Sequence, residues 1–136
     1  RTTKKLIDIM IIFWYNVRVK KRGDFMHKLT LYKGEEEVLN QKIKVDKNNN
    51  LLKFNLEDCI TTIDLESKLF TRENEEYIFS LDIQKEKCEI KLKKEDYLLQ
   101  VNVEYAILLK NQNELKLNYL IETDDNPMSL VIRKDE

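Results

Sequence analysis

Arg72 and Arg133 are the only arginines after residue 25, in a region that otherwise uses lysine for its positive charges. A guanidinium group can grip a carboxylate or a phosphate through two parallel hydrogen bonds, which a lysine ammonium group cannot do. Arg72 is therefore a candidate ligand-binding residue. The simpler interpretation, which we prefer, is a turn residue that pairs with Glu73 or Glu75.

Several aromatic residues fall on the faces that the alternation of apolar residues predicts to be buried. A buried tyrosine has an apolar ring and a hydroxyl group that needs a partner, so several of them around one lumen could hold the polar end of a small amphiphile. The alternative, which we prefer, is that these rings fill the core. Together with Arg72, the candidate ligand-binding residues are Tyr77, Phe79, Tyr97, Tyr105 and Tyr119.

The residue types that usually carry catalysis or bind metals are scarce. Cys59 and Cys88 form no CxxC motif and lie beside apolar neighbours, which predicts buried, reduced thiols rather than a disulfide or a ligand pair. His27 is the only histidine, which argues against a metal site or a Cys–His pair. Asp64 and Asp82 fall on predicted outward faces and form no acid–base pair. We therefore expect a protein that is not an enzyme, with no catalytic residue, metal or cofactor.

A long β-strand is predicted from Tyr97 to Leu109, because every odd position in this stretch is apolar or aromatic. The same alternation predicts strands within 29–32, 38–45, 52–56, 61–65, 77–83, 88–92, 115–121 and 128–132. Residues 69–71 are interpreted as an extension of the strand at 61–65. Only two glycines and one proline are present, so Asn, Asp, Lys and Glu must form the turns, as in 46–50 and 110–113.

All of these strands are joined by short turns, and no sustained helical pattern interrupts them. This arrangement predicts an all-β, antiparallel up-and-down meander of about eight or nine strands, which closes into a barrel or a pair of packed sheets. The chain has 136 residues, of which 42% are apolar, so it fits one globular domain.

Charge divides the chain at about residue 25. Residues 1–25 carry seven basic and two acidic residues, a net charge of +5, and residues 26–136 carry 17 basic and 23 acidic residues, a net charge of −6. The acidic body predicts no nucleic-acid binding. The apolar run 6–15 is too short to span a membrane.

Two interpretations of residues 1–25 stay open. Lys21 to Phe25 can be encoded by a purine-rich ribosome-binding stretch just before Met26, so the native protein could start at Met26 and consist of a single β-barrel domain, 26–136. Alternatively, residues 15–19 form one arm of a hairpin that turns at 22–24 into a strand over 25–32.

Several segments together resemble the YwiB-like family of small bacterial proteins of unknown function. The resemblance covers roughly residues 28–134 and is carried by 69–79, 88–92, 101–105 and 117–125. It implies a calycin-like, lipocalin-type antiparallel barrel, and it implies no activity, ligand or catalytic residue. The chain departs from the family at Arg72-Glu73-Asn74, where members carry a glycine two residues after the arginine, and at the charged corner 93–96.

These observations lead to one functional expectation and one alternative. We expect a cytoplasmic protein that binds a small, partly apolar molecule in its barrel, with no nucleic-acid partner and no membrane span. The alternative is a protein-interaction or structural module whose barrel is packed solid. The oligomeric state is left open.

Overall fold

Ten antiparallel strands form a closed barrel in the computed structural model, which describes residues 23–134. Each strand pairs with its neighbours in the chain, and β1 closes the ring by pairing with β10. The strands are β1 (Gly23–Lys33), β2 (Glu36–Asn48), β3 (Leu51–Leu56), β4 (Cys59–Asp64), β5 (Leu69–Glu73), β6 (Tyr77–Asp82), β7 (Lys87–Leu92), β8 (Tyr97–Lys110), β9 (Glu114–Ile121) and β10 (Met128–Lys134).

The all-β meander predicted from the sequence is confirmed, but the strand number is ten. Residues 69–71 do not extend the strand at 61–65, because the chain turns at 65–68 and Leu69–Glu73 runs back antiparallel as β5. The Cα register pairs Ile63 with Phe70, so both side chains face the interior. The described residues contain no apolar helix of membrane-spanning length.

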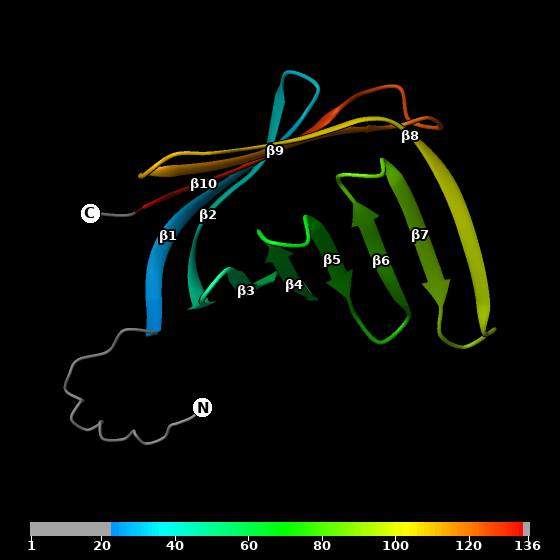
Figure 1. The fold of residues 1–136 in the computed structure, drawn as a ribbon, viewed down its shortest axis with the longest axis horizontal. Helices are drawn as coiled ribbons and strands as arrows, with labels where there is room; N and C mark the ends of the chain where they lie inside the picture. The colour runs from blue at the N-terminus through cyan, green and yellow to red at the C-terminus, as the bar shows by residue number, and fades with distance from the viewer. Residues whose placement is uncertain (1–22, 135–136) are drawn as a thin grey trace.

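The strands form two layers that cross (Figure 1). The long strands β8, β9 and β10 run across the top of the view, and β4 to β7 stand below them. Strand β8 belongs to both layers, because Tyr97–Asn102 pairs with β7 and Val103–Lys110 pairs with β9. Strand β2 joins the layers on the other side, since it pairs with β1 along its length and with β3 only at 46–48.

A β-bulge at Glu104 reverses the faces of β8. The register to β9 pairs Val103 with Ile121 and then Tyr105 with Leu120, which leaves Glu104 without an opposite residue. Beyond this extra residue, Ala106 and Leu108 pack against the core, whereas Tyr105 lies on the outer face. The prediction of one buried face from Tyr97 to Leu109, with Tyr105 on it, is therefore wrong beyond Val103.

Most of the turns use residue types other than glycine, as the composition predicted. Gly34 adopts a φ of 65° between β1 and β2, and a Cβ atom there would lie 3.2 Å from Asn126 Oδ1. Asp64 and Asp82 accept hydrogen bonds from backbone N–H groups two or three residues further along, so these carboxylates cap turns. Five residues without glycine's freedom also have positive φ: Asn49, Glu57, Lys68, Glu86 and Asp96.

The first twenty-two residues lie outside the described part of the chain, so neither the start at Met26 nor the arm at 15–19 is addressed. The strand predicted over 25–32 is present within β1, which begins at Gly23. The backbone of Gly23 to Phe25 pairs with β2.

Candidate functional site

The inward-facing residues of β4 to β8 form straight rows across the sheet, because the strands pair without irregularity between Cys59 and Asn102. In each row, side chains on neighbouring strands lie directly opposite one another. We name three of them. The inner row is Ile63, Phe70, Leu81, Cys88 and Val101; the middle row is Thr61, Arg72, Phe79, Ile90 and Leu99; the mouth row is Tyr77, Leu92 and Tyr97.

Burial decreases along these rows toward β8 and toward the mouth. The first four residues of the inner row are at most 2% exposed, which marks a packed interior. In the middle row Leu99 is 41% exposed, and in the mouth row Tyr97 is 55% exposed. Both side chains point inward by alternation with Val101, which packs against the core. The inner face of β7 and β8 is therefore open to solvent, and we call Ile90, Leu92, Tyr97 and Leu99 the open face.

Arg72 lies in the middle row, between Thr61 on β4 and Phe79 on β6. Its Nη2 atom donates to Glu57 Oε1 at 3.4 Å, and its Nε atom is buried without a hydrogen-bond partner among the described residues. The hydroxyl oxygen of Thr61 is likewise buried and unpartnered. Two polar groups on adjacent strands are thus left unsatisfied at one level of the barrel, a costly arrangement in an apolar interior.

The prediction that Arg72 is a turn residue paired with Glu73 or Glu75 is wrong. Arg72 belongs to β5 rather than to a turn, and it pairs with Glu57 from the β3–β4 turn instead of Glu73 or Glu75. The inward direction follows from alternation with Phe70, which is buried two residues earlier. Glu73 points outward and pairs with Lys93 at 2.7 Å.

Tyr77 lies at the mouth beside the thiol of Cys59. The phenol oxygen is 3.7 Å from Cys59 Sγ, and the Asn74 amide donates to the same sulfur at 3.8 Å. The hydrogen bond with Cys59 and, second, burial raise the pKa of Tyr77 above its ordinary value. Tyr77 is therefore a neutral hydrogen-bonding group at neutral pH.

Tyr119 projects from β9 into the interior above the middle row. Its ring centroid lies 6.1 Å from that of Phe70 and 6.3 Å from that of Phe79. Burial raises the pKa of the Tyr119 phenol to about 12, and the charge of Arg72 acts in the opposite direction. This aromatic cluster closes the interior beyond Arg72, so a molecule on the open face would meet Phe79 before it met the core.

The rim of this mouth is acidic. A hollow of about 420 Å³ opens between the β5–β6 turn and the β7–β8 turn. Glutamates outnumber lysines in its lining, which makes the local potential negative at neutral pH. The lining residues are Glu75, Glu76, Leu92, Lys94 and Glu95.

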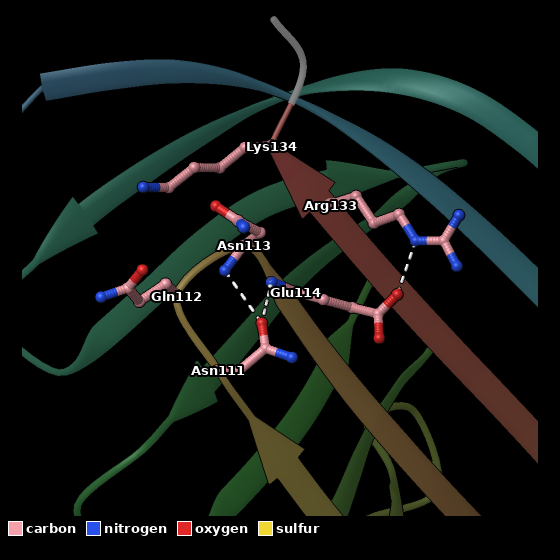
Figure 2. A pocket seen from close by; sticks show the side chains of 6 residues that line it. All are labelled: Asn111, Gln112, Asn113, Glu114, Arg133 and Lys134. Atoms are coloured by element: carbon pink, nitrogen blue, oxygen red, sulfur yellow. Dashed lines mark hydrogen bonds and ion pairs between the residues drawn. The ribbon is translucent and has the colours of Figure 1, made fainter.

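A second hollow, of about 640 Å³, surrounds the β8–β9 turn (Figure 2). Three of its side chains are engaged: Asn111 Oδ1 accepts from the backbone N–H groups of Asn113 and Glu114, and Arg133 donates to Glu114 at 2.5 Å. All six lining residues are of polar or charged types. A narrower cavity of about 110 Å³ beneath it reaches Val45 and Leu52. We therefore place the candidate site at the open face.

The structure brings most of the predicted site residues to one inner face. Arg72, Phe79 and Tyr119 lie at the level of the middle row, and Tyr77 and Tyr97 lie in the mouth row. Tyr105 is separated from them because the bulge turns it to the outer face. Both cysteines are buried free thiols, as predicted. The described residues contain no group of side chains arranged to hold a metal ion.

Five residues of this site were not singled out from the sequence: Glu57, Thr61, Ile90, Leu92 and Leu99. Each was visible as part of a strand or turn, but only strand register reveals that Thr61 and Leu99 share a level with Arg72. The partial exposure of an inward apolar row has no sequence signal, because its alternation is the same as that of a buried row.

Comparisons with known proteins identified no relative. No protein-family model matches the chain, and neither the curated proteins nor the solved structures contain a match.

Proposed function

We propose that the protein binds a small, partly apolar molecule on the open face, without catalysing a reaction. The observation that carries this proposal is the exposure of inward-facing apolar side chains, Leu99 and Tyr97, beside the half-buried Arg72. Exposed apolar surface favours an apolar ligand, since covering it releases water. The apolar body of the ligand would lie on the four residues of the open face.

The polar end of this ligand would be directed toward Arg72. The Arg72 side chain is 22% exposed, so its guanidinium N–H groups can donate to an acceptor on a ligand. Because Arg72 already holds the carboxylate of Glu57, and because glutamates dominate the rim, a second carboxylate would be repelled. An uncharged acceptor, such as the carbonyl group of an amide or an ester, fits these charges better.

A titration with matched ligands tests both parts. We expect saturable binding of a medium-chain alkyl amide, measured by displacement of an uncharged fluorescent apolar probe, and weaker binding of the carboxylic acid of equal chain length. Leu99→Asn should weaken amide binding, because it places an amide in the apolar wall. Leu98→Asn is the matched control, since Leu98 is 49% exposed on the outer face of the same strand.

The possible results separate the parts of the proposal. Absence of saturable binding in the wild-type protein would refute ligand binding, and equal effects of the two asparagine substitutions would place the ligand elsewhere. Tighter binding of the acid than of the amide would refute the uncharged head group alone. Arg72→Gln should weaken binding of the amide and leave binding of a plain alkane unchanged.

The second candidate is an interaction or structural module with a solid barrel. The packed inner row favours it, because Ile63, Phe70, Leu81 and Cys88 leave no open lumen at that level. The same titration decides between the candidates, since a protein without a ligand site will not take up the probe saturably.

We also propose the type of barrel, the family and the cellular location of the protein. The closed meander with short turns supports a calycin-like barrel, and the segments quoted above support the YwiB-like resemblance. On that basis the protein is bacterial and acts in the cytoplasm.

A further inference from the structure

Three lysines point inward at the end of the barrel where β2, β8 and β10 finish. Lys47 and Lys134 each follow a buried, inward-facing residue by two positions, and Lys110 lies opposite the buried Leu115 in the register of β8 and β9. Because side chains alternate between the two faces of a strand, all three lysines extend from the inner face of the barrel wall. The open face, in contrast, includes the start of β8.

The three lysines line one cavity, of about 110 Å³, together with the half-buried His27. Figure 2 shows Lys134 beside the β8–β9 turn, with its side chain pointing away from that of Arg133. The lysines are exposed, whereas the apolar part of the lining is at most 8% exposed and consists of Val45, Leu52, Leu115 and Ile132. We call this cavity, with its three lysines and its apolar floor, the basic pocket.

The positive charge of the basic pocket is not compensated within the described part of the chain. None of the three lysines forms an ion pair with another described residue. Glu114 is the one acidic residue in the lining, and its carboxylate accepts a hydrogen bond from Arg133, whose side chain is 66% exposed. Three ammonium groups around one cavity repel one another, so a bound anion would be stabilised there.

We propose that the basic pocket binds a small organic phosphate, with the phosphate among the lysines and a short apolar group on the apolar floor. A phosphate monoester carries a charge of about −1.5 to −2 at neutral pH, so it matches three ammonium groups better than a carboxylate does. A cavity of about 150 Å³ can hold benzene, so the cavity of about 110 Å³ fits a smaller group of about four carbon atoms. This site is separate from the open face, for which we propose an uncharged ligand.

Calorimetric titration of the full chain with butyl phosphate tests the proposal. We expect saturable binding at low ionic strength, about tenfold or more tighter than the binding of inorganic phosphate, which lacks the apolar group. Pentanoate presents the same butyl group with a single negative charge, and it should bind about fivefold or more weakly than butyl phosphate. Butanol, which has no charge, should show no saturable binding.

Substitutions then locate the ligand. Lys110→Gln and Lys134→Gln should each weaken binding of butyl phosphate by about fivefold or more, because each removes one of the three charges. Lys28→Gln is the matched control, since Lys28 is exposed on β1 next to the buried, inward-facing Leu29; it removes the same charge from the outer face and should change the affinity by less than about twofold. Leu99→Asn, on the open face, should also leave this affinity unchanged, which separates the two ligand sites.

Two acidic residues, Asp135 and Glu136, follow Lys134 in the chain and lie outside the described residues. Negative charges so close in sequence to Lys134 disfavour a bound anion. Asp135→Asn combined with Glu136→Gln should therefore strengthen binding of butyl phosphate, and weaker binding in this variant would contradict the role assigned to the lysines.

Each result supports or overturns the proposal. Absence of saturable butyl phosphate binding in the wild-type protein overturns it, as does an effect of Lys28→Gln equal to that of Lys110→Gln, which would show attraction to the overall charge alone. Equal affinities for butyl phosphate and inorganic phosphate overturn the role of the apolar floor, and tighter binding of pentanoate overturns the phosphate group. Thermal melts of the lysine variants should match that of the wild-type protein, so that a loss of binding reports the lost charge rather than unfolding.

Discussion

Thr61 and Arg72 carry the buried polar atoms that lack partners among the described residues. The Thr61 hydroxyl lies in a wholly buried side chain, whereas Arg72 reaches a partly exposed carboxylate through Nη2. An unsatisfied buried hydroxyl lowers the free energy of unfolding, whereas a methyl group in the same place would not.

Replacing the hydroxyl of Thr61 with a methyl group tests this cost. We expect Thr61→Val to raise the free energy of unfolding by about 1 kcal/mol, because valine has the same shape and needs no partner. Thr62→Val is the control, since the Thr62 hydroxyl bonds to that of Thr71, and it should lower stability by about 0.5–1 kcal/mol. Urea denaturation measures both changes. A loss of stability in Thr61→Val would show that its hydroxyl has a partner.

Two buried acids make the fold sensitive to alkali. Burial raises the pKa of Tyr119 to about 12 and that of Cys88 to about 11, from ordinary values of 10.0 and 9.0. The unfolded chain releases these protons first as the pH rises, so it binds fewer protons than the folded chain and stability falls. We expect the free energy of unfolding to decline from about pH 9 to pH 12.

Single substitutions test whether Tyr119 and Cys88 cause this fall in stability at alkaline pH. Tyr119→Phe and Cys88→Ala each remove one titrating group, so each should flatten the curve, whatever it does to stability at neutral pH. Denaturation series at pH 7 and above pH 10 give the slope. A slope identical to that of the wild-type protein in both variants would assign the pH dependence to other groups.

The sequence identified most of the residues of the candidate site, but it did not identify the partner of Arg72. Arg72 stood out because lysine fills all but one of the other Lys and Arg positions after residue 25. Four of the six predicted site residues share the inner face of β5 to β8, and Tyr119 projects into the same interior from β9. The partner Glu57 is 15 residues away in sequence, across a turn with positive φ. Such a pair depends on register, which a local charge pattern does not encode.

Strand β8 is the element that lines part of the candidate site and joins the two layers. Its first half lines the open face, and its second half completes the other layer after the bulge at Glu104. Alternation correctly predicted the length of this strand. It did not predict the bulge, because residues 105–109 are apolar at every position and fit either face.

Substitutions just before the bulge test the faces assigned to β8. Val103 is buried on the inner face, so Val103→Asp should abolish cooperative unfolding or cost more than about 3 kcal/mol through an unpaired buried carboxylate. Asn102 is exposed on the outer face, and Asn102→Asp should change stability by less than about 0.5 kcal/mol. Thermal melts followed by circular dichroism distinguish the two. Similar losses in both variants would contradict the assignment.

One part of the inner surface of the barrel is packed and stabilises the fold, and another part is exposed to solvent. The inner row and the aromatic cluster around Tyr119 fill one part of the barrel, and the open face leaves another part uncovered. The sequence predicted a closed all-β meander because alternation and polar turns recur along the chain. It did not predict where the inner face is left exposed, since that depends on how far the crossing layers overlap.

A comparison of two leucines measures this division. Leu81 is fully buried in the inner row, so Leu81→Ala should lower the free energy of unfolding by about 3 kcal/mol through lost burial and a cavity. Leu99 faces the same interior but is 41% exposed, and Leu99→Ala should cost less than about 1 kcal/mol. Urea midpoints at an unchanged m-value give both numbers. A large loss for Leu99→Ala would mean that this side chain is covered in solution, whereas a small loss, together with weaker probe binding, shows apolar surface held for a ligand rather than for the fold.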